Sequence, residues 1–464
     1  MSKPYEPTAE DIAKAEQRRL KREQAKKNAP TVAEDERGQI LPREWLDVSP
    51  HLASIEGRTV RVMTWNLLAQ SLVRRELFPT SDCLKAGQRE HMLYREILSH
   101  NAAICCLQEV DRTEKLFPVL EKANYAWVYA AGPRKKHGCL IAYRKDAFEC
   151  IRRKVVTYDD QEIRKDGDEQ ARRGSSFRTK NIGSLVALRQ LGSAEDGVIV
   201  ATTHLFWHPA YAYERARQAA ILLREVTKFR SEGTEPEARW PSIIAGDFNF
   251  QPDDPAYSLL AGEPLLPGQK ARLEASRVVH ATIDPSIAVE GAAQAEEEEE
   301  GAESGENDPD RIIVNARAAQ PSDGLMTDDE LEQLYRQLGT PTSVYDAGQR
   351  TIPGISESGL TFGGKGTIPS NRRGSFEPCY TSYTHVREHV HYAKNGADRV
   401  PGPQYWKSVL DYIFVLDAPG RDVSVVRLAK PHSKESFGDG LPRKGVCGSD
   451  HISLAADLHW PPLQ

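Results

Sequence analysis

The chain has 464 residues, of which 39% are hydrophobic and 28% charged, and its formal net charge is -6. This length is enough for one large domain or two ordinary ones, and the composition is that of a globular protein. No apolar stretch is long enough to span a bilayer, which excludes a membrane-embedded chain and a membrane partner. The charged N-terminus lacks the apolar core of a secretory signal, and seven cysteines without C-x-x-C spacing favour a reducing compartment. We therefore expect the cytoplasm, the nucleus or both, and not secretion.

Residues 1–57 are expected to form a basic, flexible extension. The segment from Ile12 to Asn28 contains many Lys and Arg residues but almost no apolar stripe, so it is predicted to be a solvated helix or unstructured. Two interpretations are open. The extension is either an arm that contacts RNA, a ribosome or another RNA–protein particle, or a solubilising tail.

Strand patterns begin near Arg58 and at first alternate with helical patterns. Helices are predicted at 88–100, 114–123 and 213–229. Strands are predicted at 59–65, 102–107, 125–130, 138–143, near 155, and at 182–188, 198–203, 243–245, 380–385, 409–416, 423–428 and 452–458. Alternation early in the chain and strands late in it predict an α/β sandwich, with sheets in the middle and helices outside. We expect one catalytic domain over 58–464.

The regular pattern lapses between Gly262 and about Thr340. The run from Glu296 to Glu300, flanked by Gly, Ala and Ser, is of low complexity and cannot bury a core. We therefore expect an acidic insertion at about 284–325. Within the irregular stretch, residues 327–338 are predicted to form one capped amphipathic helix.

The stretch from Ser242 to Tyr257 is the centre of the predicted site. Its apolar start predicts a buried strand, and Gly246 ends that strand where a side chain would crowd a neighbouring backbone. Asp247 and Asn249 then point the same way off an extended segment. Asp247 offers charge for a hard metal or a water, and Asn249 can donate to a phosphoryl oxygen. The alternative is a strand followed by a simple turn, because Asp, Asn and Pro favour turns.

Polar side chains of similar kinds end the other apolar runs as well. Each alone is explained by a cap or a turn, but together they supply hard oxygen ligands and two imidazoles: Asn66, Glu109, His204, Asp247, Asn249, Asp411, Asp450 and His451. Without cysteine ligands or an H-E-x-x-H motif, the usual zinc sites are not indicated. Oxygen ligands with few carboxylates suit Mg2+, with Mn2+ as a substitute. This set predicts metal-assisted attack of water on a phosphoryl centre.

Six short blocks carry a resemblance to a known family. They are WN at 65–66, QEVD at 108–111, TTHL at 202–205, GDFN at 246–249, LDYIF at 410–414 and SDHISL at 449–454. In this order they resemble the endonuclease/exonuclease/phosphatase superfamily over nearly all of 58–458 except the insertion. THLFWHP at 203–209, with Gln218 in the following helix, is similar to the deadenylase and nocturnin branch. Within that branch, the chain looks most like the fungal Ngl-type RNA exonucleases. The resemblance implies a four-layer α/β sandwich, two central mixed sheets flanked by helices.

The same resemblance implies the metal ligands and the group that acts on water. Glu109 would be the main Mg2+ ligand, helped by Asn66, and Asp450 would help to hold a second metal. Asp247 would orient or deprotonate the attacking water. Asn249 would hold the scissile phosphate.

The remaining implied roles concern the substrate. His451 would contact the phosphate and balance its developing negative charge, and Asp411 would fix the tautomer of that histidine. His204 would be a further phosphate contact, Asn181 would line the same cleft, and Pro209 and Trp406 would be walls for a base. Deadenylases usually have Phe at the position of Trp406 and Asp at that of His208, so strict adenine preference is not implied.

Three functions are compared. The first is an Mg2+-dependent RNA 3′–5′ exonuclease that releases 5′-mononucleotides from single-stranded 3′ ends, either as a deadenylase or in trimming ribosomal or other RNA. Trp207, Tyr383 and Trp406 could stack on bases, although core packing explains each equally well. The second is a phosphatase or phosphodiesterase for a small nucleotide or a lipid phosphate. The third, a non-enzymatic adaptor, is disfavoured because every metal and phosphate group is kept.

One segment near the predicted site carries a prediction about direction of cleavage. Residues 385–403 are too polar for a core and contain Arg387, Lys394 and Arg399. We expect them to form one wall of the cleft, with these cations on the RNA backbone, so that only chain ends are cut. The alternative is a solvent loop without contacts. The protein is expected to act as a monomer.

Overall fold

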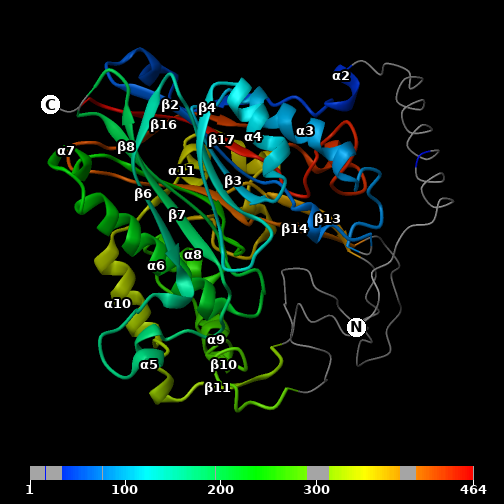
Figure 1. The fold of residues 1–464 in the computed structure, drawn as a ribbon. Helices are drawn as coiled ribbons and strands as arrows, with labels where there is room; N and C mark the ends of the chain where they lie inside the picture. Colours follow the sequence, from blue (N-terminus) through cyan, green and yellow to red (C-terminus); the bar gives the residue numbers. More distant parts are fainter. Residues whose placement is uncertain are drawn as a thin grey trace.

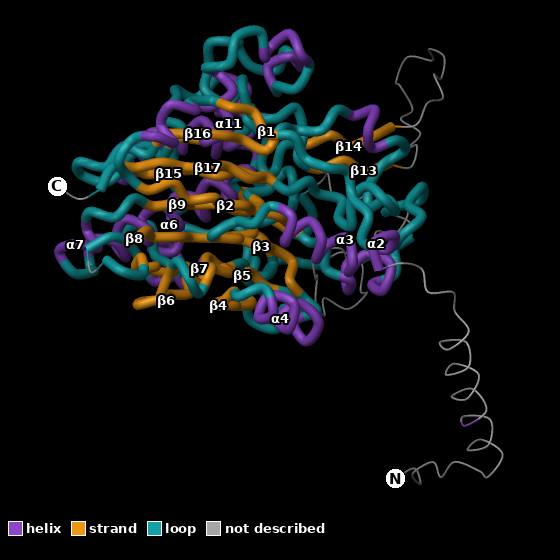
Figure 2. The backbone as a smooth tube through the Cα atoms, turned by 90° about the horizontal axis from the view of Figure 1, so that it is seen from above, coloured by secondary structure: helices purple, strands orange, loops and turns teal. Residues whose placement is uncertain are grey.

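Two large mixed β-sheets lie face to face, and helices cover their outer faces (Figures 1 and 2). The structure is a computed structural model, and it describes Glu16 and residues 34–75, 77–193, 195–289, 313–386 and 404–462. The expected four-layer α/β sandwich is therefore confirmed. Among the described residues, no helix combines the length and the apolar character needed to cross a bilayer.

The first sheet has seven strands in the order β1-β16-β17-β2-β3-β5-β4. β2 and β3 run parallel, and the other neighbours are antiparallel. Its outer face packs against α3 (Ala86–Ser99) and α4 (Thr113–Lys122). The strands are β1 (Trp45–Asp47), β2 (Arg58–Asn66), β3 (Ile104–Val110), β4 (Tyr125–Ala131), β5 (Gly138–Arg144), β16 (Ser424–Ala429) and β17 (Leu454–Trp460).

The second sheet has six strands in the order β12-β15-β9-β8-β7-β6. β8 and β9 run parallel, and the other neighbours are antiparallel. Its strands are β6 (Phe148–Thr157), β7 (Ile182–Gln190), β8 (Gly197–His204), β9 (Ser242–Asp247), β12 (Thr342–Ser343) and β15 (Asp411–Leu416). Its outer face is covered by α6 (Ala212–Ser231), α8 (Pro255–Leu260), α9 (Pro267–Ala275) and α10 (Asp328–Leu338).

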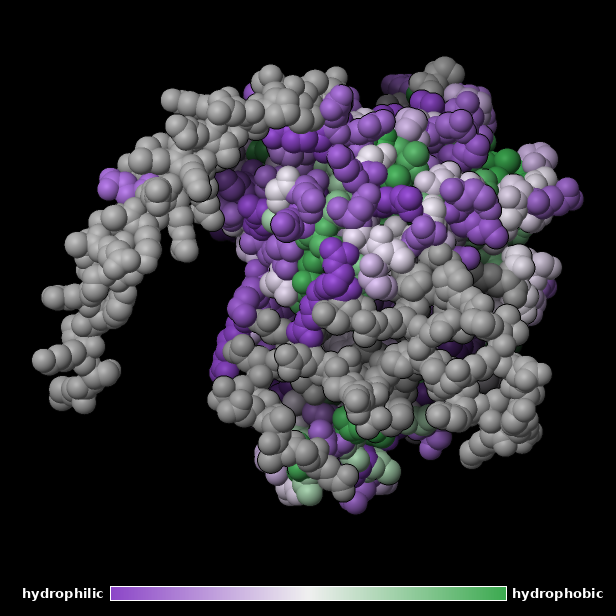
Figure 3. Space-filling view, turned by 90° about the vertical axis from the view of Figure 1, so that its right-hand side faces the viewer, coloured by the Kyte–Doolittle hydropathy of each residue, from purple (hydrophilic) through white to green (hydrophobic). Residues whose placement is uncertain are grey.

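Burial on both faces explains the continuous apolar strands. In β9, Ile243 and Ala245 face the other sheet, whereas Ile244 packs under the outer helices. A strand covered on both sides has no polar face, so its sequence does not alternate. On the outside, the helices turn polar residues to solvent, and hydrophilic residues form most of the described surface on the side shown in Figure 3.

The domain begins before Arg58, where the strand pattern placed its boundary. β1 pairs with β16, and α2 (Glu34–Arg37) packs near α3. The part of the expected flexible extension from residue 34 onward is therefore packed on the domain. A strand of three residues is too short to show alternation. The basic segment 12–28 lies outside the described residues except for Glu16.

Both ends of the expected insertion are ordered. β10 (Val278–His280) and β11 (Ala316–Ala318) pair antiparallel, and the glutamate run between them lies outside the described residues. The predicted capped helix is present as α10. The side chain of Thr327 accepts the backbone N–H of Glu330, and Leu331 and Tyr335 pack into the core. Helix α9, which begins at Pro267, lies where no pattern was found.

Three further elements adjoin the two large sheets. β13 (Ser382–Val386) and β14 (Gln404–Ser408) form a separate antiparallel pair. Of the predicted cleft wall 385–403, the residues 387–403 that join the two strands lie outside the described residues. Helix α11 (Val344–Arg350) packs against β15 and β16, which are each second from an edge of their sheet. The sequence pattern had indicated neither β14 nor α11.

Candidate active site

The strands that carry the predicted residues end at the same edge of the sandwich. The parallel strands β2 and β3 bring Asn66 and Glu109 to the edge of one sheet. The parallel strands β8 and β9 bring His204 and Asp247 to the edge of the other sheet, as directly paired residues. Because β2 packs against β9 and β3 against β8, the two sets of side chains meet between the sheets.

Gly246 permits the close pairing of strands just before the site. A Cβ atom on this residue would lie 2.2 Å from the carbonyl oxygen of Thr203 on β8. This distance is far below van der Waals contact, so only glycine fits here. The structural reason predicted for this glycine is thus present. The close pairing of Gly246 with Thr203 places Asp247 directly beside His204.

One amide nitrogen joins carboxylates from the two sheets. Asn66 Nδ2 donates to Glu109 Oε1 at 2.7 Å and to Asp247 Oδ2 at 2.9 Å. The other oxygen of Glu109 accepts the backbone N–H of Ala69 at 2.7 Å. Glu109 has a φ of +54°, at an irregularity in β3, and this left-handed conformation aims its side chain at the gap between the sheets.

The donor set fits a hard divalent cation. Oxygens of Glu109 and Asp247 gather around one amide group, and carboxylate oxygens are the ligands that Mg2+ takes. The predicted help of Asn66 in metal binding stays a prediction. The Oδ1 of Asn66 accepts the N–H of Leu68 at 2.9 Å and is turned away from the carboxylates. In this arrangement Asn66 positions the carboxylates and does not offer an oxygen ligand.

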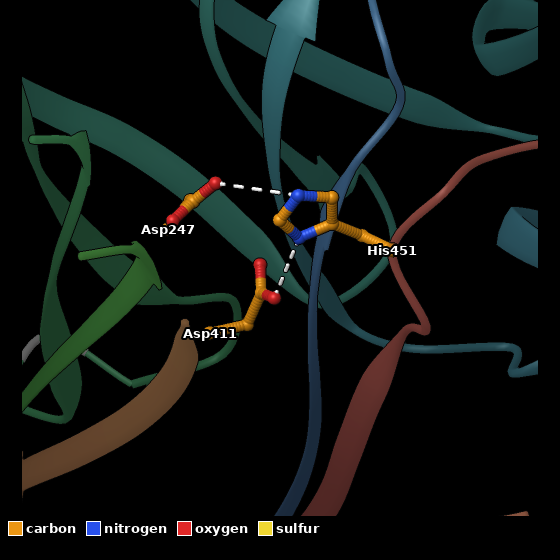
Figure 4. A group of neighbouring side chains, drawn as sticks. All are labelled: Asp247, Asp411 and His451. Carbon is orange, nitrogen blue, oxygen red and sulfur yellow. Dashed lines mark hydrogen bonds and ion pairs between the residues drawn. The ribbon is translucent and has the colours of Figure 1, made fainter. Parts of the chain in front are cut away.

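His451 lies between two carboxylates (Figure 4). Its Nδ1 is 2.7 Å from Asp411 Oδ2, and its Nε2 is 3.7 Å from Asp247 Oδ2. The antiparallel pairing of β15 with β9 places Asp411 directly opposite Asp247. Thr381 Oγ1 accepts the backbone N–H of Asp411 at 3.1 Å, and Trp65 Nε1 donates to the carbonyl of His451 at 2.8 Å. The ring is therefore held from several elements.

The charge state of this pair follows from its surroundings. Burial lowers the pKa of His451, but the carboxylates of Asp411, Asp450 and Asp247 outweigh it and raise that pKa well above its ordinary value. Burial raises the pKa of Asp411 to about 6, against the opposing effect of His451. At neutral pH the two thus form an imidazolium–carboxylate pair.

An imidazolium has no lone pair for a metal. Ligand atoms of Asp247, Asp411 and His451 all lie within 4.8 Å of one another, so this group could be taken for a metal site. Protonated His451 instead suits a contact with phosphate, because both ring nitrogens then donate. Asp450, the residue before His451, is half-buried, and its backbone carbonyl accepts the N–H of Tyr383 at 3.0 Å.

Three more of the predicted residues surround Asp247. His204 Nε2 lies 3.7 Å from Asp247 Oδ2, and Asn181 Nδ2 donates to the carbonyl of His204 at 2.7 Å. The backbone N–H of Asn249 donates to Asp247 Oδ1 at 2.9 Å, and its Nδ2 donates to the carbonyl of Leu205 at 3.0 Å. Asn249 has a φ of +51°, so the chain turns sharply after β9.

The aromatic residues proposed as base platforms differ in their surroundings. Pro209 is exposed and Trp207 half-buried, in keeping with a surface that a base could contact. Tyr383 is only 4% exposed and packs with Tyr380 and Phe437, so for this residue core packing is the correct interpretation. In β14, the backbone of Trp406 pairs with that of Thr384 in β13, and the side chain of Trp406 lies outside the described part of the chain.

One buried residue of the site was not found in the sequence. Arg89, on α3, is 2% exposed and donates to the carbonyls of Leu67, Leu68 and Gly448, each at 2.6 Å. It thereby ties the loop after Asn66 to the loop before His451. The sequence feature that could have indicated its burial is the helical spacing, because Arg89 lies three residues before Met92 on the buried face of the helix.

A family model described as Endonuclease/Exonuclease/phosphatase family matches residues 63–451. The chain belongs to this family. The matched range contains the segments from β2 to His451, and with them every side chain placed at the edge of the sandwich. The resemblance seen in the six sequence blocks is thereby confirmed.

Two relatives of the chain are named as RNA exonucleases. The chain is 29% identical, over 97% of its length and 88% of the relative's, to a probable RNA exonuclease of Schizosaccharomyces pombe. It is 27% identical to RNA exonuclease NGL2 of Saccharomyces cerevisiae, over 87% of this chain and 79% of that one. The similarity to Ngl-type RNA exonucleases is therefore shown.

A solved structure supports the fold. ANGEL2, described as a 2′,3′-cyclic phosphatase, is 20% identical and superposes with a TM-score of 0.51 over 90% of this chain and 99% of the other. At this identity the likeness establishes the shared architecture of two mixed sheets flanked by helices.

Proposed function

We propose that this protein is a metal-dependent 3′–5′ exonuclease of single-stranded RNA. The observation that carries the proposal is the meeting of Glu109 and Asp247, from different sheets, at Asn66 Nδ2 beside a histidine held by Asp411. This arrangement offers a hard-metal ligand, a carboxylate base and a cationic phosphate contact within one site. The similarity to named RNA exonucleases over most of the chain supports RNA as the substrate.

The chemistry can be derived from the positions of these side chains. Glu109 would hold Mg2+, which supplies positive charge to the phosphate oxygens when bound. Asp247 lies 3.7 Å from both His204 and His451 and accepts a proton as water attacks phosphorus. The new bond joins the water oxygen to phosphorus, and the broken bond joins phosphorus to the 3′ oxygen of the preceding nucleotide. The product is then a 5′-mononucleotide.

His451 and Asp411 stabilise the charge that develops on the phosphate. An imidazolium that is already paired with a buried carboxylate costs little reorganisation when a phosphoryl oxygen approaches Nε2. Asn249 and His204 would hold the same phosphate from the side of β8 and β9. Action as a monomer in the cytoplasm or nucleus, and contact of the basic N-terminal arm with an RNA–protein particle, are parts of this proposal.

The test compares linear and circular RNA of one sequence, labelled internally, with Mg2+, with Mn2+ and with EDTA. We expect stepwise shortening of the linear RNA to 5′-mononucleotides, resistance of the circle, and no reaction in EDTA. Efficient cutting of the circle would identify an endonuclease. Turnover of a small nucleotide or inositol phosphate in preference to RNA would identify a phosphatase.

A further inference from the structure

A cationic depression adjoins the candidate active site. Glu109 and His204 line one side of it. The other side is formed by two loops, of which the loop between β4 and β5 contributes Lys135 and His137, and the segment before β7 contributes Lys180. Both lysines are half-buried and His137 is buried. The proposed chemistry at the scissile bond uses none of these three residues.

The two loops are held together through their backbones. A Cβ atom on Gly132 would lie 1.9 Å from the carbonyl oxygen of Lys180, so the loops touch where only glycine fits. The carboxylate of Asp159 accepts the N–H groups of Thr179, at 3.0 Å, and Lys180, at 2.9 Å. Lys180 has a φ of +58°. The bases of the two lysine side chains are therefore fixed on one rim before any substrate binds.

Further cationic side chains lie on the two loops. Arg134, Lys136 and Arg178 are exposed on the same two loops. The ring of His137 lies 6.3 Å from that of His204, so the rim adjoins the phosphate contacts of the active site. Glu109 is the acidic residue that lines the depression, and a metal on Glu109 would neutralise it. The depression therefore suits an anion that lies next to the scissile phosphate.

We propose that Lys135, His137 and Lys180 form a subsite for a second phosphate of the substrate, adjacent to the phosphate that is cleaved. The inference rests on the proposed function, because it assigns that phosphate to an RNA end. The phosphate is either the internal linkage on the 5′ side of the scissile bond or a phosphate on the 3′ end. A substrate with one phosphate leaves this subsite empty, so the subsite selects chains over mononucleotides.

The test measures binding separately from cleavage. Fluorescein-labelled single-stranded RNA with a 3′ hydroxyl is titrated, in EDTA, with the full chain and with a variant that combines Lys135→Gln and Lys180→Gln. We expect the variant to raise Kd about tenfold and to lower the slope of log Kd against log salt concentration by about 0.7 for each phosphate that it no longer neutralises. Lys270→Gln, at an exposed lysine on α9, is the matched control and should not change the slope.

Two further RNAs distinguish the source of the phosphate. One has an uncharged methylphosphonate linkage on the 5′ side of the scissile bond, and the other has a 3′ phosphate. If the internal linkage is bound, the variant and the unsubstituted protein bind the methylphosphonate RNA equally. If the terminal phosphate is bound, the variant shows weaker binding only with the 3′-phosphorylated RNA.

The outcome that overturns the subsite is equal Kd for the variant and the unsubstituted protein with all three RNAs. The combination of Lys135→Arg and Lys180→Arg keeps both charges and should restore affinity, and thermal melting of each variant checks the fold. Failure of the unsubstituted protein to shorten RNA in Mg2+ would contradict the proposed function and not the subsite, because binding is measured without cleavage.

Discussion

At the residue scale, Asn66 shows how a neutral side chain prepares a site for a cation. Its single amide nitrogen lies between two carboxylates that would otherwise repel each other. A metal ion and the amide of Asn66 would be alternative partners for these carboxylate oxygens. The energetic cost of bringing Glu109 and Asp247 together is thus met partly by a hydrogen-bond donor before a metal is present.

Replacement of the predicted metal ligand should abolish the chemistry and leave the fold intact. Glu109→Ala removes a carboxylate that is only 8% exposed at the meeting point of the sheets. We expect kcat for RNA cleavage to fall on the order of a thousandfold, because the charge that holds the metal is removed. Glu121→Ala, at an exposed glutamate on α4, is the control for removing an acidic side chain. Near-normal turnover by folded Glu109→Ala protein would rule out Glu109 as the metal ligand.

A buried carboxyl far from the chemistry should make stability depend on pH. Burial and the charge of Asp346 raise the pKa of Glu377 to about 8 from an ordinary 4.5, and Tyr257 donates to it at 2.7 Å. The folded protein therefore holds a proton that the unfolded chain releases above pH 4.5. The contribution of this proton to the free energy of unfolding is fully present below pH 4.5. It declines by roughly 1.4 kcal/mol per pH unit as pH rises toward 8.

The substitution Glu377→Gln tests this pH dependence. Glutamine resembles the protonated carboxyl and cannot ionise, so the variant should lose the decline and unfold at a higher urea concentration than the natural protein at pH 8. Urea unfolding at pH 5, 6.5 and 8 measures both proteins. Parallel curves for the two would show that Glu377 is ionised in the folded state.

At the element scale, the parallel strand pairs fix the geometry of the site. A substitution at Gly246 tests the importance of the pairing between β8 and β9. Gly246→Ala places a methyl group 2.2 Å from the carbonyl of Thr203, so β8 and β9 must separate just before His204 and Asp247. We expect a loss of roughly 2 kcal/mol in the free energy of unfolding, typical of overpacking, together with reduced kcat.

A second glycine gives the matched control. A Cβ on Gly268, in α9, would meet no atom within 4 Å. Gly268→Ala should therefore leave kcat unchanged and stabilise the helix by up to about 1 kcal/mol. If both alanine variants behave alike, the close approach of the strands is not what Gly246 provides.

Local sequence patterns predicted the long elements and the residues at their ends. Asp247 and Gly246 follow a run of apolar residues that can be recognised without any partner. Asn66 is different, because the orientation of its amide depends on Glu109, 43 residues away, and on Asp247, 181 residues away. The short elements β1, β14 and α11 were missed for a related reason, since packing and pairing with distant segments stabilise them more than their own propensities do.

At the scale of the whole molecule, the acidic insertion should be dispensable. The insertion lies between β10 and β11. His280 pairs there with Ala316, so the two strands that flank the insertion are held together without it. Deletion of residues 288–310 should shift Tm by less than about 2 °C and should not reduce cleavage of short RNA. A large decrease in either quantity would mean that the deleted segment packs against the domain.

Because the last residues of the site lie close to the C-terminus, the site can form only when synthesis of the chain is nearly complete. Ser449, which donates to the carbonyl of Asn66, is made 383 residues after it, and β17 then inserts between β16 and β2. A nascent chain that already contains Glu109 and Asp247 still lacks His451. Under the proposed function, the unfinished protein lacks this phosphate contact, and a chain cut short before His451 lacks it as well.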